Sequence, residues 1–175
     1  MAFLTRITDD TGQKVATLTS VRHCYLLPDG TQMWIPVIPA WCRGCGAFTM
    51  VERLEDPAKI EAAAHDFFRQ RQSHPLLPLQ TPEFAEAVNR NVLERSLHDA
   101  QQWRLALRDR RSPPRCLICG GIEYTTIPDD GGWCPHPADP ARRVRAECFA
   151  HASTEGFGNL YDTEGRRIPG RLASR

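Results

Sequence analysis

The pattern Cys-x-x-Cys-Gly occurs twice in this chain, from Cys42 to Gly46 in "WCRGCG" and from Cys116 to Gly120 in "CLICG". Two cysteines separated by two residues can place both sulfur atoms on one side of a tight turn, where they bind a metal ion or form a redox dithiol. The glycine that follows permits the left-handed backbone in which such turns end. We expect its backbone N–H to point at a thiolate.

Four thiolates supplied as two pairs are a common ligand set of a structural zinc ion. We therefore predict one zinc ion bound by Cys42, Cys45, Cys116 and Cys119. Iron would take the same four thiolates, so the ligands do not separate the two metals, and availability favours zinc. Because four cysteines leave no open coordination position, the predicted role of the ion is structural.

Both turns are followed by residues typical of strands, and together they resemble the metal-binding knuckles of the zinc-ribbon and rubredoxin-like class. The resemblance covers residues 40–54 and 114–127 and implies a β-rich metal-binding fold. The chain departs from a compact ribbon because residues 46–115 separate the two cysteine pairs. An inserted antiparallel helical hairpin explains this separation. The two ends of such a hairpin lie close together, so its insertion keeps the flanking cysteine turns near each other.

A second group of residues with ligand chemistry lies in "WCPHPADPARRVRAECFAH". Cysteine and histidine are both zinc ligands, so the group is a candidate for a second zinc site. In the alternative interpretation the two cysteines are small buried apolar residues and the two histidines are exposed. The four residues are Cys134, His136, Cys148 and His151.

The segment "AWCRGC" also permits a thiol-disulfide oxidoreductase, because thioredoxin-like proteins place a tryptophan before Cys-x-x-Cys. In those proteins the motif begins a helix, whereas Cys45 is followed here by glycine and β-type residues. The hypothesis also leaves the second cysteine pair unexplained. It predicts reversible titration of Cys42 and Cys45 without loss of metal.

The arginines of residues 101–175 suggest a nucleic-acid-binding module as an alternative function, because arginine binds phosphate through two parallel hydrogen bonds. The net charge of +1 argues against strong electrostatic binding. Arginines near a helix C-terminus also complement the helix dipole, and we favour this interpretation for the arginines of "RLALRDRRSPPR" at the end of the second predicted helix. The candidate contacts are Arg108, Arg110, Arg111, Arg115, Arg142, Arg143 and Arg145.

The tryptophans are a further feature of such a module, because nucleic-acid bases stack on exposed aromatic rings. Covering the metal site is the simpler interpretation for those near a cysteine pair or a glycine turn. The four are Trp34, Trp41, Trp103 and Trp133.

Two helices are predicted between the cysteine pairs. Asp56-Pro57 and Thr81-Pro82 are typical helix starts. The second helix continues for about thirty residues, to about Arg111. The apolar residues expected on its buried side are Phe84, Val88, Val92, Leu97, Ala100, Trp103 and Leu107. Those of the first helix are Ile60, Ala63, Ala64, Phe67 and Phe68.

The remaining segments predict an α+β fold. It comprises a small β-rich zinc ribbon with N-terminal β-hairpins and a long antiparallel helical hairpin inserted between the two knuckles. Residues 1–55 and 113–175 form the ribbon domain, and residues 56–112 form the inserted arm. Pro36 and Pro39 place their strand at a sheet edge, because proline donates no ladder hydrogen bond. The last third is expected to be rich in loops until "FGNLYDTEGRRIPG", whose "DTEG" centre predicts a terminal β-turn.

No motif of a known catalytic class occurs, so we expect neither an enzyme nor a small-molecule substrate. No apolar run could span a membrane and no targeting segment is visible, which predicts a cytoplasmic protein without a membrane partner. The favoured function is a non-enzymatic zinc-binding accessory protein. It would dock on a protein partner through its ribbon and helical arm.

Overall fold

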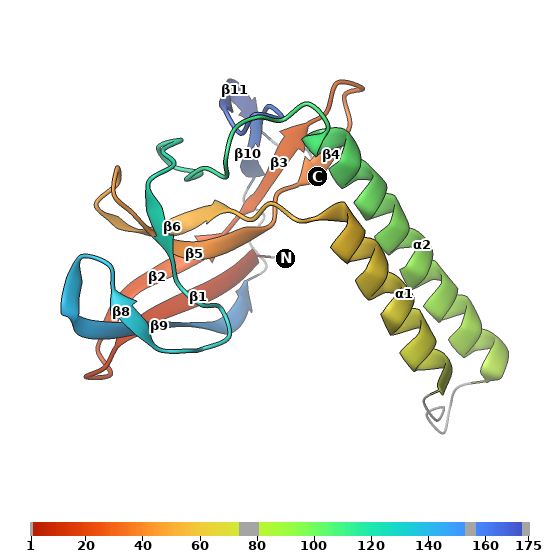
Figure 1. Cartoon of the computed structure of the whole chain (residues 1–175), viewed down its shortest axis with the longest axis horizontal. Helices are drawn as coiled ribbons and strands as arrows, with labels where there is room; N and C mark the ends of the chain where they lie inside the picture. The colour runs from red at the N-terminus through yellow and green to blue at the C-terminus, as the bar shows by residue number, and fades with distance from the viewer. Residues whose placement is uncertain (1, 74–80, 153–156, 173–175) are drawn as a thin grey trace. The chain divides into compact units, whose positions relative to one another are not determined.

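The computed structural model describes residues 2–73, 81–152 and 157–172, which form eleven strands and two helices (Figure 1). The chain divides into two compact units. The first comprises Met1–Leu54 and Arg110–Arg175, and it contains all of these strands. The second, Glu55–Asp109, contains both helices.

The predicted fold, a small zinc ribbon carrying a long helical hairpin, is wrong. The strands of the described residues form three sheets, so the chain is β-rich and the ribbon is only one part of its strand unit. The error lies mainly in the part of the last third before residue 157, which was expected to be loop-rich, whereas the predicted terminal turn does join β10 (Phe157–Tyr161) and β11 (Arg167–Leu172). The part before residue 157 contains β9 (Asp139–Ala152), the longest described strand. The alanines and arginines of this strand have weak β-propensity, so its pairing partners rather than its own residues establish it.

The first sheet has the strand order β2-β1-β9-β8. The hairpin of β1 (Ala2–Asp9) and β2 (Lys14–Ser20) pairs with β9 along the length of β1. The short strand β8 (Cys134–His136) completes the sheet on the other side of β9.

The second sheet has the order β11-β10-β3-β4. Strand β3 (Arg22–Leu26) pairs antiparallel with β4 (Gln32–Trp34) and parallel with β10 (Phe157–Tyr161). Strand β11 (Arg167–Leu172) forms the other edge. Segments from the two ends of the chain therefore meet in one sheet.

The third sheet has the order β6-β5-β7 and positions the cysteines. Strand β5 (Val37–Cys42) lies between β6 (Ala47–Glu52) and β7 (Tyr124–Thr126), so the predicted edge position of this strand is wrong. Proline is tolerated because the pairing with β7 begins at Ala40, after Pro39.

A shared core joins the first and third sheets. Ile7 and Val144 of the first sheet are fully buried against Phe48 and Met50 of β6, together with Ile127 just after β7. This apolar cluster fixes the sheet that carries the cysteines.

The helices α1 (Pro57–Ser73) and α2 (Pro82–Leu107) pack against each other within their unit. Both begin at the predicted prolines, and Asp56 caps α1 by accepting the N–H of Ala58 at 2.9 Å. Helix α2 ends at Leu107, before the predicted end near Arg111.

The predicted buried sides of the helices are correct only in part. Ala100 and Trp103 are buried, but Val88 and Val92 are 44% and 37% exposed, and the inward positions before Ala100 are Leu93 and Leu97. On α1, Ala64 is buried, whereas Ala63 and Phe67 are exposed. The side chain of Phe84 lies outside the described residues. The predicted apolar stripe through Val88 and Val92 is offset by one residue from the observed one, which runs through Leu93 and Leu97.

Candidate metal centre

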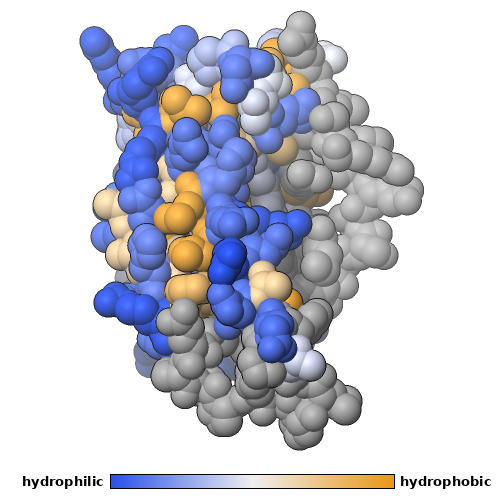
Figure 2. All heavy atoms as spheres, turned by 90° about the vertical axis from the view of Figure 1, so that its right-hand side faces the viewer, coloured by the Kyte–Doolittle hydropathy of each residue, from blue (hydrophilic) through white to orange (hydrophobic). Residues whose placement is uncertain are grey.

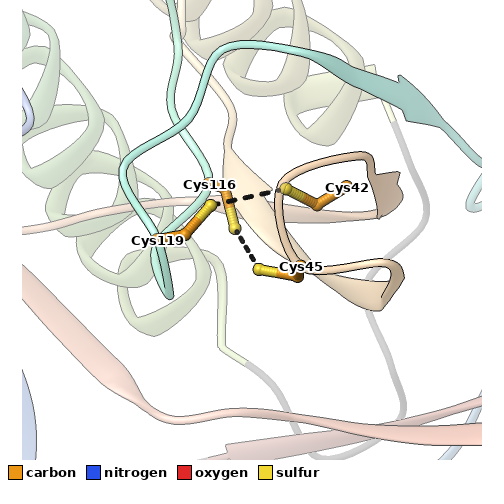
Figure 3. A group of neighbouring side chains, drawn as sticks. All are labelled: Cys42, Cys45, Cys116 and Cys119. Atoms are coloured by element: carbon orange, nitrogen blue, oxygen red, sulfur yellow. Dashed lines mark hydrogen bonds between the residues drawn. The ribbon is translucent and has the colours of Figure 1, made fainter.

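The four cysteines of the two Cys-x-x-Cys-Gly patterns meet in one cluster, as Figure 3 shows. We call residues 42–46 the first knuckle and residues 116–120 the second. The sulfur atoms of Cys42 and Cys119 are 3.5 Å apart, and those of Cys45 and Cys116 are 3.8 Å apart. All four sulfurs lie within 4.8 Å of one another, which is an arrangement like that of zinc-ribbon knuckles and close enough to hold one metal ion.

The sheet holds the two knuckles together. Cys42 ends β5 and pairs with Tyr124 of β7, the strand that follows the second knuckle. On the other side, Cys116 forms a bridge with Val51 of β6, the strand that follows the first knuckle. Each knuckle is therefore bonded to the strand that leaves the other, and the sulfurs converge because the backbone pairs.

The glycines that end the knuckles adopt the left-handed conformation, with φ of 61° at Gly46 and 72° at Gly120. Our expectation for their N–H groups was wrong, because these donate to backbone carbonyls of their own turns, at 3.2 and 2.8 Å. In the second knuckle, the N–H of the following residue, Gly121, donates to Cys119 Sγ over 3.4 Å. One residue closes the turn and its neighbour solvates the thiolate.

Two glycines that the sequence analysis did not single out make room for Cys119. A Cβ atom at Gly44 would lie 3.3 Å from Cys119 Sγ, and a Cβ at Gly121 would lie 3.2 Å from it. Glycine is therefore favoured at both positions because the Cys119 sulfur is close, and not because the backbone needs a positive φ there. In the sequence, Gly44 lies inside the first knuckle and Gly121 directly follows the second.

The surroundings of Cys42, Cys45 and Cys119 shift the pKa values of these thiols in different directions. Burial raises the pKa of Cys42 and that of Cys45, so both favour the neutral thiol when no cation is present. The Gly121 N–H lowers the pKa of Cys119, the exposed member, to about 7. Binding of a metal cation would release protons from the buried thiols.

A buried ion pair supports the second knuckle. The side chains of Glu52 and Arg110 are 0% and 2% exposed, and Arg110 Nη2 lies 2.6 Å from Glu52 Oε2. The Tyr25 hydroxyl donates to Glu52 Oε1 at 2.7 Å, and the Arg115 N–H donates to Glu52 Oε2 at 2.8 Å. This carboxylate at the end of β6 thus fixes the backbone directly before Cys116.

Arg110 uses all of its donors inside the protein. Besides Glu52, its guanidinium donates to Tyr25 Oη at 2.9 Å and to the carbonyls of Ser112 and Pro113 at 3.0 Å each. A Cβ at Gly165 would lie 2.6 Å from Glu52 Oε1, so only glycine fits beside the pair. Glu52 was not among the residues predicted from the sequence, since an acidic residue at a strand end usually faces water.

Two more side chains hold the second knuckle from its other side. The Tyr161 hydroxyl donates to the Leu117 carbonyl at 2.7 Å, in a buried contact. The Arg115 guanidinium donates to the carbonyls of Gly120 and Glu164 at 3.0 Å each. These contacts preorganise the turn that carries two of the four sulfurs.

The candidates for a second metal site are not brought together. Cys134 lies opposite Val144, four residues before Cys148 on β9, so the two Cα positions are about 13 Å apart along the strand. His136 is buried beside Trp41, and its Nδ1 accepts the N–H groups of Ala138 and Asp139 at 3.1 Å each.

The other two candidates give no support for such a site. Cys148 is exposed, and the side chain of His151 lies outside the described residues. The alternative interpretation, in which the cysteines are buried and the histidines exposed, also differs from the structure, since His136 is buried. Among the described residues, the Cys42, Cys45, Cys116 and Cys119 cluster is the one group with metal-binding geometry.

Three of the seven candidate nucleic-acid contacts bind buried carboxylates or backbone carbonyls of the strand unit. Arg110 and Arg115 form the contacts described above, and Arg142 pairs with the fully buried carboxylate of Asp9. The Asp9 carboxylate also accepts hydrogen bonds from Thr11, chiefly from its hydroxyl group, and these lower the pKa of Asp9 to about 2. Asp9 and Arg142 therefore tie the β1–β2 hairpin to β9.

The remaining four arginines lie in different places. Arg108 is exposed beside Asp109 in the helical unit. The backbone N–H of Arg111 donates to Glu164 Oε1 at 3.0 Å, and its side chain is exposed. Arg143 and Arg145 both lie over the ring of Trp133.

Comparison with models of protein families, with characterised proteins and with solved structures finds no match for this chain. Neither helix of the described part of the chain is long and apolar enough to cross a membrane. The site is therefore interpreted from its own geometry.

Proposed function

We propose that Cys42, Cys45, Cys116 and Cys119 bind one structural zinc ion in a non-enzymatic accessory protein. The spacing of the sulfurs carries this proposal. A tetrahedral zinc site with Zn–S bonds of about 2.3 Å has S···S edges of about 3.8 Å. The sulfur–sulfur distances of 3.5 and 3.8 Å between the two knuckles agree with this edge length.

A structural rather than catalytic role is supported by the ligand set. Four thiolates fill a tetrahedral sphere, so no position remains for water or substrate. Cys42 and Cys116 are 0% and 1% exposed, and both are bonded into the sheet. When bound, the ion offsets the repulsion of four close thiolates and joins two segments that are distant in sequence.

Thiol-disulfide exchange at Cys42 and Cys45 is the less favoured function. The sulfur contacts of 3.5 and 3.8 Å join cysteines of different knuckles, which suits a shared ion rather than a disulfide within one turn. The raised pKa values of both residues also make them weak nucleophiles, because the thiolate is the reactive form.

For a partner, we propose a protein that docks on the apolar residues of the helical unit. Two antiparallel helices bury one side of each helix, yet α1 and α2 expose Phe67, Val88, Val92 and Leu105. Figure 2 shows one face of the molecule, where hydrophobic residues form small groups between hydrophilic ones. Apolar groups of this kind lose contact with water when a partner binds.

Cobalt titration tests the metal site. Co²⁺ bound by four thiolates gives intense visible absorption, and we expect saturation at one ion per chain followed by displacement with Zn²⁺. Cys116→Ser should abolish the thiolate spectrum, whereas Cys24→Ser, at a buried cysteine outside the cluster, should retain it. Saturation with no tetrahedral thiolate spectrum would contradict the proposed ligand set.

Partner docking is tested separately by capture of one identified protein that is then re-examined in purified form. Val88→Asp and Val92→Asp should weaken its binding, because each places a charge at an exposed apolar position of α2. Asn91→Asp, an exposed polar neighbour on the same helix, is the matched control. Equal binding by all three variants would show that the partner does not use this surface.

A further inference from the structure

The outer face of the first sheet carries three arginines. Side chains alternate along a strand, so the burial of Ile7 on β1 and of Val144 and Ala146 on β9 assigns one face to the core. The residues between and beside them, Arg6, Arg143 and Arg145, occupy the opposite face.

Two exposed aromatic rings lie among these arginines. Trp133, directly before β8, is 38% exposed, and the guanidinium carbon of Arg145 lies 4.9 Å from its ring centroid. Phe149 on β9 is 45% exposed, and the guanidinium carbon of Arg6 lies 4.5 Å from its ring centroid. The face therefore presents two aromatic surfaces, each with a cation beside it.

The charged groups of this face have a net positive charge. Glu147 pairs with Arg145, its Oε1 lying 3.1 Å from Arg145 Nη1. At the hairpin end, the Asp10 carboxylate accepts the backbone N–H of Arg143 at 3.2 Å. Three guanidinium groups thus stand against two carboxylates, and the ligand chemistry that complements them is anionic.

We propose that this face, formed by Arg6, Trp133, Arg143, Arg145 and Phe149, binds single-stranded nucleic acid. Bases that are not paired stack on exposed aromatic rings, and arginines bind the phosphates between them. Arg145 and Phe149 are four residues apart on β9 and the register with β1 shifts at Phe149, so the two ring sites are separated by at most about 13 Å along the strand. A single strand lying along β9 can reach both.

Single strands fit better than duplexes or simple polyanions. In a duplex the bases are stacked on each other and cannot stack on protein rings. The whole chain has a net charge of +1, so electrostatic attraction alone is weak and stacking must supply much of the binding. With three arginines, we expect log K to fall with log salt at a slope of about −2, at roughly 0.7 per phosphate contacted.

The proposal is tested by fluorescence anisotropy with the full-length protein. The probes are labelled 12-mers of uridylate and thymidylate, which separate RNA from DNA, with a 12-bp duplex and heparin as comparisons. We expect binding of at least one single strand, weaker binding of the duplex and heparin, and the shallow salt slope given above. Arg143→Ala should reduce the slope by about 0.7.

Substitution of the rings separates stacking from charge. Trp133→Ala and Phe149→Ala should each weaken single-strand binding by about 5-fold or more, whereas Trp133→Phe, which keeps a ring, should retain most of it. Trp34→Ala is the matched control, since Trp34 is 45% exposed on β4 of another sheet. Melting temperatures of all variants verify the fold.

Three results would overturn the proposal. The first is no binding of either single strand at low salt, which is also the expected result if a folded protein covers this face instead. The second is equal or tighter binding of heparin or duplex, which would indicate attraction by charge alone. The third is unchanged affinity of the folded Trp133→Ala and Phe149→Ala variants.

Discussion

Replacing Glu52 with glutamine should destabilise the strand unit strongly. The Glu52 carboxylate is fully buried and accepts hydrogen bonds from Tyr25, Arg110 and Arg115. Glutamine has nearly the same shape, but it carries no charge and its amide nitrogen is a donor. If that nitrogen takes the place of Oε2, it faces two N–H donors, and Arg110 is left as a buried charge without a counterion.

The expected loss follows from the burial of both partners. Removing one member of a buried ion pair costs about 3–5 kcal/mol, whereas exposed pairs contribute about 0–1 kcal/mol. For a chain of this size the loss corresponds to a decrease in melting temperature of about 6–20 °C. Urea denaturation of the zinc-saturated protein measures it. Arg53→Gln, which breaks the exposed pair of Arg53 with Asp129, is the control and should change stability by less than about 1 kcal/mol.

A loss below about 1 kcal/mol in Glu52→Gln, equal to that of the control, would refute this reasoning. The double variant Glu52→Gln with Arg110→Met separates the causes, because it removes the charge that the single variant leaves unpaired. It should be more stable than Glu52→Gln alone.

Three further predictions concern other positions. Gly165→Ala should cost clearly more stability than Gly12→Ala in urea denaturation, because both positions have positive φ but only Gly165 is crowded by Glu52; equal losses would contradict the crowding. Burial, with a smaller effect of the Arg167 charge, lowers the pKa of His23 to about 4, so the unfolded chain takes up a proton near pH 6.5 and the folded protein does not. Stability should therefore fall as the pH decreases from about 6.5 to 4, and His23→Gln should reduce that slope; parallel pH profiles would contradict it. Cys148→Ser should leave the metal content measured by elemental analysis unchanged, and a loss of bound metal would restore the second-site hypothesis.

The metal cluster was predictable because its sequence patterns are short and because a tetrahedral metal site requires four ligands. Cys-x-x-Cys followed by glycine specifies each turn locally, and four thiolates need one another to bind an ion. The glycines that accommodate Cys119 were less visible, since their role depends on a sulfur from the other knuckle or from the same turn. The distances between the knuckles came only from the pairing of β5 with β7 and of Val51 on β6 with Cys116.

Local patterns predicted the N-terminal hairpins, which β1–β2 and β3–β4 form, but not how these strands join later ones in sheets. Strand β9 is established by pairing with β1, which lies at the other end of the chain. Glu52 is buried because Arg110, distant in sequence, neutralises it. On α2, the choice between Val92 and Leu93 as the inward residue depends on which side meets α1, and the 3.6-residue period permits both.

The metal content of the purified full-length protein, measured by native mass spectrometry together with elemental analysis, tests the central claim most directly. We predict one zinc ion per chain, and its loss when Cys42 and Cys116 are both replaced by serine. A folded protein that carries no metal after zinc is supplied, or that keeps its zinc in the double variant, would contradict the account.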